Sequence, residues 1–346
     1  ENLDLYADLH GVLPEEQRER YPRLLEMTAL APFTDRLAGR LSGGMKQKLG
    51  LACTLIRSPE LLLLDEPTVG VDPVSRRELW EIIRQLVNDE SLTVLLSTSY
   101  LDEAEHCGYV LVLHNGKVLA QGSPHEVSAL AKDRTFLVAP PPGQKARILQ
   151  AQLLEQASVV DAVPEGGQVR FVTQDRVKAE NGKMTTEIGS EKLEPSSIHL
   201  SSFILRSSRV PPRFEDGFMV LLRQTVNTAT PDKDTRRKGD KEKGSGAQGD
   251  KGKRRQGETP VVQVHDLVRR FGNFTAVDHI GFEVSKGEIF GLLGPNGAGK
   301  TTTFRMLCGL LPATSGTLRV AGVDLRRARA SARQRIGYVA QKFSLY

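Results

Sequence analysis

The sequence is poor in cysteine, in aromatic residues and in long apolar runs. It has three cysteines, Cys53, Cys107 and Cys308, with no CxxC spacing, and only 5% aromatic residues. An odd number of widely spaced cysteines argues against a disulfide framework or a zinc site and fits a reducing compartment. The longest apolar runs, such as Leu61–Leu64 and Val94–Leu96, are far shorter than the roughly 20 residues that cross a bilayer. The chain therefore has no transmembrane helix candidate of its own.

The remaining composition is that of an ordinary globular protein. Of the 346 residues, 39% are hydrophobic and 26% charged, and the length suffices for two domains with separate cores. The net charge of +5 is concentrated in residues 232–255, which hold ten Lys or Arg against five Asp or Glu. A basic, Gly-rich stretch is typical of a solvated linker, with an RNA or anionic membrane contact as the alternative.

A phosphate-binding loop lies near the C-terminal end. The pattern GxxxxGK[ST] covers Gly294–Thr301 and directly follows the apolar run Ile289–Leu293. Glycines let several backbone N–H groups converge on one anion, and the helix expected over Thr301–Leu311 adds the positive end of its dipole. We expect Lys300 to reach the β- and γ-phosphates and Thr301 to bind Mg²⁺. The alternative, a Gly-rich turn without a ligand, is disfavoured by the complete pattern.

Two carboxylates end the apolar run Leu61–Leu64. At the carboxyl edge of a buried strand, Asp65 and Glu66 suit Mg²⁺ binding and water activation respectively. A helix-capping role is the structural alternative for a single Asp. About twenty residues upstream, the sequence LSGGM at 41–45 precedes an amphipathic helix expected over Met45–Ile56. This loop predicts a second anion-binding helix N-terminus, with Ser42 as an extra donor.

The order of these motifs is the reverse of that in a single nucleotide-binding domain, in which the phosphate loop comes first. LSGGM at 41–45 and LLLLDEP at 61–67 lie near the N-terminus instead. The simplest interpretation is a piece of a tandem protein cut at both ends, and a first residue Glu1 rather than Met agrees with this. We therefore expect the back half of one ATPase domain over 1–130 and the front half of the next over 260–346.

Between these halves we expect a small accessory α+β extension over 131–225 and a disordered linker over 226–259. The linker prediction rests on a stretch with almost no apolar residues and many Gly and Lys. The apolar patterns outside the motifs predict strands at Thr93–Ser97, Thr135–Val138, Val169–Thr173, Ser201–Leu205, Val261–Val264 and Ile280–Val284, a hairpin over Tyr109–Ala120 and a helix at Gln144–Gln156.

Together the motifs resemble the ABC transporter ATPase family, over roughly 1–130 and 261–346. The resemblance implies a three-layer α/β P-loop NTPase fold with ATP and Mg²⁺ as cofactors. The ATP-binding residues it implies are Phe271, Gly294, Pro295, Asn296, Gly297, Ala298, Gly299, Lys300, Thr301, Thr302, Ser42, Gly43 and Gly44; the catalytic residues are Glu66, Gln341 and Ser99; the metal ligands are Thr301, Gln341 and Asp65.

Several of these roles come from the resemblance alone. Phe271 resembles the aromatic residue that stacks on adenine, with an ordinary core aromatic as the alternative. Gln341 resembles the glutamine of the Q-loop, and Val69–Asp72 the D-loop. Ser42, with the glycines that follow it, resembles the signature that contacts the γ-phosphate bound to an opposing domain.

The variants GVDPVSRRELW, STSYLDEAE and QKFSLY look like tandem ATP-binding subunits of ABC-2-type exporters, and PPRFEDGFMVLL at 211–222 resembles the motif closing their accessory extension. This implies a cytoplasmic ATPase, peripheral at the inner face of the cell membrane. It would drive efflux of drugs or similar small molecules through a separate ABC-2-type permease, without a nucleic-acid partner.

The alternative is a soluble tandem ABC protein acting on the ribosome. Five glycines within 239–252 disfavour the long helical linker expected of that class.

Neither half can bury its central strands alone, because each needs strands that lie in the other half. In one arrangement the halves form a circularly permuted domain in which Lys300 and Asp65 share a pocket, and a second copy must present Ser42. In the rival arrangement two incomplete domains remain, and Ser42 faces the phosphate loop across an interface. Two ligands of one Mg²⁺ lie roughly 4–6 Å apart, so the distance from Thr301 Oγ to the Asp65 carboxylate distinguishes the permuted domain from the two incomplete domains.

One position departs from the family pattern, which has a histidine where STSYLDEAE carries Ser99. Serine cannot act as imidazole does beside the γ-phosphate, so we expect weak hydrolysis at a site that nonetheless retains Glu66. Replacing Ser99→His in the full-length protein should therefore raise ATP turnover. Unchanged steady-state turnover in this variant would count against the explanation.

Overall fold

The computed structural model describes residues 1–180, 183–186, 203–204, 206–228 and 259–341. The helical elements are α1 (Asn2–His10), α2 (Pro14–Met27), η1 (Ala31–Phe33), η2 (Ala38–Arg40), α3 (Gly43–Leu55), α4 (Pro73–Glu90), η3 (Leu101–His106), α5 (Pro124–Ala129), α6 (Ala146–Leu154), α8 (Phe214–Thr228), α9 (Lys300–Leu307) and α10 (Arg329–Arg333). In the described part of the chain, no helix combines the length and the apolar character needed to span a membrane.

The strands are β1 (Leu61–Asp65), β2 (Thr93–Thr98), β3 (Tyr109–His114), β4 (Lys117–Gly122), β5 (Thr135–Val138), β6 (Val159–Glu165), β7 (Gln168–Thr173), β8 (Val177–Glu180), β9 (Lys183–Thr186), β10 (Ser207–Arg209), β11 (Val262–Phe271), β12 (Phe274–Val284), β13 (Ile289–Leu293), β14 (Ser315–Val320), β15 (Val323–Asp324) and β16 (Ile336–Val339).

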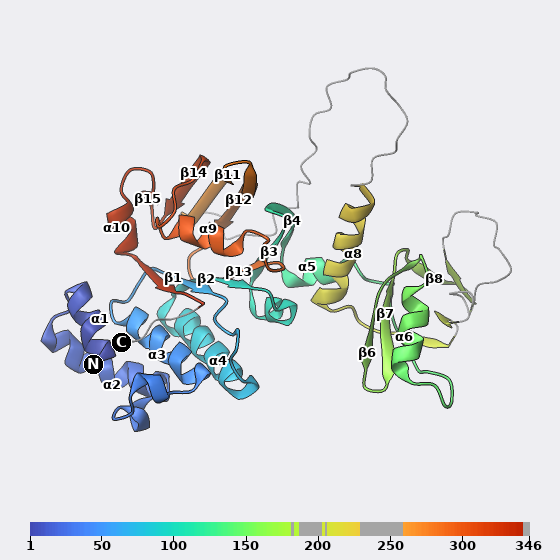
Figure 1. The fold of residues 1–346 in the computed structure, drawn as a ribbon, viewed down its shortest axis with the longest axis horizontal. Coiled ribbons are helices and arrows are strands. Elements are labelled where there is room, and N and C mark those ends of the chain that lie inside the picture. Colours follow the sequence, from blue (N-terminus) through green and yellow to red (C-terminus); the bar gives the residue numbers. More distant parts are fainter. Residues whose placement is uncertain (181–182, 187–202, 205, 229–258, 342–346) are drawn as a thin grey trace, which may run out of the picture. The chain divides into compact units, whose positions relative to one another are not determined.

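The two motif-bearing segments form one compact unit. The described parts of residues 1–121 and 251–346 cluster together, and those of residues 122–250 form a second unit. In the first unit, a six-stranded sheet has the order β16-β1-β2-β13-β3-β4 (Figure 1). Strand β13, from the C-terminal segment, runs parallel to both β2 and β3 from the N-terminal segment. The hypothesis of a circularly permuted domain is confirmed, and the rival arrangement of two incomplete domains is wrong.

The parallel sheet is buried on both faces. Every residue of β1, β2 and β13 is buried, which explains why these strands are near-continuous apolar runs rather than alternating ones. On one face, Leu63, Phe290 and Leu292 share a core with the sheet β12-β11-β14-β15 and with α9. Helix α4 packs against β2, and α3 packs against β16. The result is the three-layer α/β arrangement expected from the sequence.

Local sequence signals account for the helices and the turn that border the parallel sheet. Ser42 caps α3 by accepting a hydrogen bond from the Met45 N–H, and Asp72 caps α4, whose first residue is Pro73. The β3–β4 hairpin turns at Asn115 (φ 49°) and Gly116 (φ 78°), the residue types that tolerate a left-handed backbone in a two-residue turn.

Some boundaries differ from the expectations. Strands β11 and β12 are longer than predicted and meet in a turn after Phe271, because a long paired ribbon shares the core with α9. Helix α9 stops at Leu307, since Gly309 adopts a left-handed φ of 66°. The predicted strand Ser201–Leu205 is wrong at 203–204, which are helical; its other residues lie outside the described ones. Within the predicted linker, α8 extends to Thr228, and 229–258 lie outside the described residues.

The second unit is a small α+β fold. A four-stranded antiparallel sheet, β10-β5-β7-β6, packs on α6 around Phe136 and Phe171, whose rings stack at 5.5 Å. Helices α5 and α8 also pack together: a Cβ on Gly217 would lie 2.0 Å from the Val127 carbonyl oxygen. A buried pair, Arg170 Nη2 to Asp216 Oδ2 at 2.7 Å, ties β7 to α8.

The permuted sheet predicts that both segments of the first unit unfold together. Phe290 on β13 is fully buried, between Tyr109 of one segment and Phe282 of the other. Phe290→Ala should therefore lower the free energy of unfolding by about 3–5 kcal/mol. Hydrogen exchange should show faster opening in β2 and in β13 alike. Phe274→Ala, at a side chain that is 64% exposed, serves as the control; opening of β13 alone would contradict the permuted domain.

Candidate functional site

The phosphate loop is held in shape by strands on both sides. Gly294 has a φ of 149°, and a Cβ there would lie 2.3 Å from the Leu113 carbonyl oxygen at the end of β3. Gly299 has a φ of 104°, and its Cβ would lie 2.6 Å from the Ala276 carbonyl oxygen on β12. Only glycine fits at such positions. The loop is thus wedged between a strand of the N-terminal segment and one of its own.

Lys300 is buried inside this loop. Its side chain is 4% exposed, and Nζ donates to the carbonyl oxygens of Gly294 at 2.7 Å and Pro295 at 3.1 Å. It also forms an ion pair with Glu66 Oε1 at 3.2 Å. A buried ammonium needs such partners because burial otherwise disfavours its charged form. Lys300 therefore faces Glu66, the residue directly after β1.

Three side-chain hydroxyl groups donate hydrogen bonds to Asp65. Thr301 Oγ1 donates to Asp65 Oδ1 at 3.3 Å, so the two groups share one pocket and lie closer together than the roughly 4–6 Å of two ligands of one ion, because a direct hydrogen bond joins them. Ser97 Oγ donates to the same oxygen at 2.5 Å, and Tyr338 donates to Oδ2 at 3.4 Å. Burial, together with the Asp65 charge, raises the pKa of Tyr338, so its hydroxyl keeps the proton that it donates.

This oxygen set fits Mg²⁺. A threonine hydroxyl and one carboxylate, side by side at a helix N-terminus, are the donors that Mg²⁺ takes when phosphates and water complete its shell. Among the described side chains no group of three or more His, Cys, Asp or Glu could hold a metal ion. That is expected here, because such magnesium sites use only one or two protein carboxylates.

Glu66 has an unusual backbone, with a φ of 50°. Left-handed conformations of this kind are costly for a non-glycine residue and persist where surrounding contacts enforce them. Here the Glu66 N–H donates to the Ser97 carbonyl oxygen at 3.0 Å, and Gln341 Nε2 donates to Glu66 Oε2 at 3.4 Å. Contacts with Ser97 of β2 and with Gln341, the predicted Q-loop glutamine, therefore fix the orientation of Glu66.

The signature residues lie apart from this cluster. Ser42 is exposed, and its Oγ accepts from the Met45 N–H at 3.2 Å. A Cβ on Gly44 would lie 2.3 Å from Ser75 Cβ, and one on Gly43 would lie 3.2 Å from the Gly70 carbonyl oxygen. The glycines thus pack on the predicted D-loop and the start of α4. No hydrogen bond among the described residues joins Ser42 to the phosphate loop.

The remaining predicted residues are at the rim of the site. Phe271 is 45% exposed, and the Arg269 guanidinium carbon lies 4.4 Å from its ring centroid, so it is not a core aromatic. Ser99 is half-buried and makes no hydrogen bond to a described residue. In the phosphate loop Pro295, Asn296 and Gly297 are exposed, and Ala298 is buried like Gly294, Gly299 and Lys300; Thr302 on α9 is half-buried.

Sequence reasoning missed two residues that contact Asp65. Ser97 lies directly opposite Asp65 in the parallel pairing of β1 and β2, so its position in the neighbouring strand was the available signal. Tyr338 lies on β16, which pairs with β1 on its other side. The short run Ile336–Val339 contains a glycine and was not predicted as a strand, so nothing placed Tyr338 beside Asp65.

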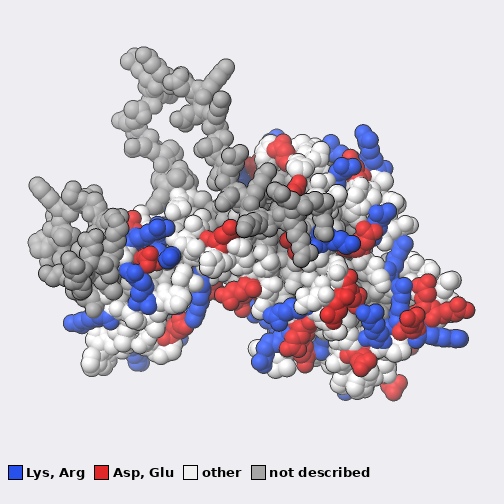
Figure 2. Space-filling view, turned by 180° about the vertical axis from the view of Figure 1, so that it is seen from behind, with Lys and Arg blue, Asp and Glu red and all other residues white. Residues whose placement is uncertain are grey.

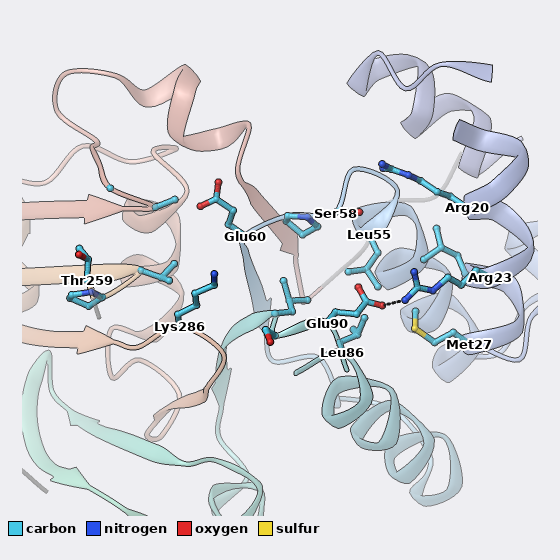
Figure 3. Close-up of a pocket in the computed structure, with 18 residues that line it drawn as sticks. Arg20, Arg23, Met27, Leu55, Ser58, Glu60, Leu86, Glu90, Thr259 and Lys286 are labelled. Atoms are coloured by element: carbon cyan, nitrogen blue, oxygen red, sulfur yellow. Dashed lines mark hydrogen bonds and ion pairs between the residues drawn. The ribbon is translucent and has the colours of Figure 1, made fainter. Parts of the chain in front are cut away.

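A cavity of about 510 Å³ lies elsewhere in this unit (Figure 3). Glu60, Leu92 and Lys286 line it, next to the amino ends of β1, β2 and β13. At its wall, Arg23 pairs with Glu90 at 2.6 Å. In open parallel sheets, ligands of the main site bind at the carboxyl ends of the strands, where Asp65 lies. The cavity is therefore not part of the phosphate site.

Comparisons with known proteins agree with the geometry. A family model described as ABC transporter matches residues 1–69 and 277–346. The probable multidrug ABC transporter ATP-binding protein YbhF of Escherichia coli (strain K12) is 45% identical over 351 residues, covering 100% of this chain and 55% of that protein. The daunorubicin/doxorubicin resistance ATP-binding protein DrrA of Streptomyces peucetius is 42% identical over 130 residues, 37% of this chain and 39% of its own length. The chain thus spans about half the length of the relative that it matches throughout.

The bond from Ser97 to Asp65 predicts a measurable stability difference. Ser97→Ala removes the hydroxyl donor of a buried carboxylate and should lower the free energy of unfolding by about 1–3 kcal/mol. Ser99→Ala, two residues along the same segment, should change it by less than about 0.5 kcal/mol, because that hydroxyl bonds no described residue. Urea denaturation of both variants tests this; equal effects would contradict the role of Ser97.

Proposed function

We propose that this chain, whose residues 1–69 and 277–346 match the ABC transporter family, is part of the ATP-binding and ATP-hydrolysing subunit of an exporter. The proposal is carried by one observation: Thr301 and Lys300, from one end of the chain, contact Asp65 and Glu66, from the other. Phosphate-loop lysine, metal aspartate and adjacent glutamate in one pocket are the parts that phosphoryl transfer to water requires.

ATP would be held by the phosphate loop, α9 and Phe271. The triphosphate would compete with Glu66 for Lys300, because both are anions within reach of one ammonium. The N-terminus of α9 adds its dipole, and the exposed Phe271 offers a ring face to adenine. Thr301 and Asp65, with Gln341 nearby, would hold Mg²⁺, which neutralises charge on the phosphates.

Displacement of Lys300 would free Glu66 to orient the attacking water. Its carboxylate is nearly buried, and the Gln341 amide contacts one of its oxygens. A carboxylate held in this way can accept a hydrogen bond from water aligned with the γ-phosphate. With Ser99 at the family's histidine position, we expect this step to be slow.

The complete site would require a second ATPase domain. Ser42 is exposed at the N-terminus of α3, where backbone N–H groups and its hydroxyl can meet an anion from outside. We propose that Ser42, Gly43 and Gly44 contact the γ-phosphate bound to an opposing domain. In the longer protein, the segments 1–130 and 260–346 would belong to consecutive domains, with the extension 131–225 and linker 226–259 between them.

We propose that the partner is an ABC-2-type membrane permease and that the subunit is cytoplasmic, peripheral at the inner face of the membrane. The similarity to the multidrug protein YbhF and to the daunorubicin/doxorubicin resistance protein DrrA supports export of drugs or similar small molecules. Figure 2 shows Lys and Arg interspersed with Asp and Glu on the described part of one face.

Lys300 gives the direct test of ATP binding. Lys300→Ala removes the cation that meets the phosphates and should weaken binding of a fluorescent ATP analogue at least tenfold, which is about 1.4 kcal/mol. Lys286→Ala, an exposed lysine on the far edge of the sheet, should leave the affinity unchanged. Equal affinities in the two variants would overturn the assignment of this loop, as would a wild-type chain that fails to bind the analogue.

A further inference from the structure

A third carboxylate, Glu103, is completely buried close to Asp65 and Glu66. It lies in η3 with 0% exposure. Its Oε1 accepts from Thr68 Oγ1 at 2.6 Å and from Arg76 Nε at 2.9 Å, and its Oε2 has no hydrogen-bond partner among the described residues. A buried carboxylate is tolerated only where a cation and directional donors offset its desolvation. Both donors are therefore essential to the arrangement.

The groups that meet at Glu103 come from three different segments. Thr68 is two residues beyond Glu66, in the loop that leaves β1. Arg76 lies in the first turns of α4, and it also pairs with Asp102 at 2.9 Å and lies 4.8 Å from the Tyr100 ring centroid. Glu103 itself follows Ser99 by four residues. One carboxylate thus joins the loop after Glu66, the start of α4 and the segment after β2.

The start of α4 is also the surface on which the signature packs. Ser75 is the neighbour that a Cβ on Gly44 would meet at 2.3 Å, and the Ser75 N–H donates to the capping Asp72 at 3.0 Å. Arg76 is the next residue. The first turn of α4 therefore contacts the signature glycines through Ser75 and Glu103 through Arg76, the next residue.

From this geometry we infer that Glu103 is a positioning residue that couples the signature loop to Glu66. The inference rests on the proposed function, in which Ser42 acts on the nucleotide of an opposing domain and Glu66 on the nucleotide of its own. Engagement of Ser42–Gly44 displaces the start of α4, Arg76 transmits the displacement to Glu103, and Thr68 passes it to Glu66. Glu103 thereby connects two nucleotide sites within one domain.

A natural fluorophore, Trp80, lies next to the groups that surround Glu103. Trp80 is the only tryptophan; it lies one turn along α4 from Arg76 and is 2% exposed. Its ring centroid lies 4.5 Å from that of His106, the last residue of η3. A change in the packing of η3 against α4 alters this ring contact, so Trp80 fluorescence reports the position of the segment that carries Glu103.

The decisive experiment is hydrogen exchange on the complete chain and on Glu103→Gln, which removes the charge with little change in shape. In Glu103→Gln we expect at least tenfold faster exchange at two amides. The Val71 N–H donates to the Thr68 carbonyl oxygen, and the Lys46 N–H donates to the Ser42 carbonyl oxygen. Trp80 emission should shift in parallel. Asp102→Asn, at the exposed partner of the same Arg76, is the matched control and should change neither.

Thr68→Val provides a second variant that removes one hydrogen bond while keeping the side-chain volume. It should accelerate exchange at the same two amides, so a poorly folded Glu103→Gln protein does not block the test. Acceleration confined to η3 in both variants would show that Glu103 is merely a local structural residue and would overturn the inference. Faster amide exchange at both Val71 and Lys46 supports the inference, whether nucleotide is present or not.

A nucleotide arm separates this inference from the proposed function. With ATP and magnesium, Glu103→Gln should lower kcat at least tenfold while KM stays within twofold, because Glu103 touches no phosphate-binding group. Unchanged kcat in a chain that hydrolyses ATP would overturn the coupling. If the wild-type chain neither binds nor hydrolyses ATP, the proposed function fails, whereas the exchange result still decides whether Glu103 links the two loops.

Discussion

The insertion of β13 between β2 and β3 is the interaction on which the rest of the structure depends. An apolar parallel strand cannot remain at an edge without exposing unpaired backbone groups and both of its faces. Gly291 of β13 pairs with Leu96 on one side and Val110 on the other, so one segment fills the gap in the sheet of the other. The site follows from this, because the carboxyl ends of β1 and β13 then lie at one edge and bring Asp65 and Glu66 to the phosphate loop.

The charges at that edge are mutually dependent. Lys300 and Glu66 are both nearly buried and are paired with each other, so removing either partner leaves an uncompensated charge in a low-dielectric setting. Asp65 is stabilised instead by hydroxyl donors from Ser97, Thr301 and Tyr338. The two carboxylates, adjacent in sequence, thus occupy different environments: one is poised to exchange its cation partner, and the other is fixed by neutral groups. This division agrees with the proposed roles of Glu66 in orienting water and of Asp65 in holding Mg²⁺.

The sequence predicted what depends on local pattern. The strands predicted at Leu61–Leu64 and Ile289–Leu293, the helix after LSGGM and the glycine loop all carry signals within a few residues of themselves. It did not predict Tyr338 beside Asp65 or the burial of Glu103, because both depend on which strands and helices become neighbours. The predicted strand at 203–204 failed for a related reason: a short apolar run has no periodicity that separates helix from strand.

Because one chain carries both segments of the first unit, its sheet forms by folding within one molecule and not by association of two molecules. The two segments of the first unit are joined through residues 122–250, so their association is intramolecular and independent of protein concentration. The intervening unit acts as a tether that sets the effective concentration of one segment around the other. A single backbone cleavage in that tether would leave every contact of the sheet intact, yet the stability of the first unit would then vary with dilution. In this fold, covalent continuity thus contributes as much as any side chain to keeping Lys300 opposite Glu66.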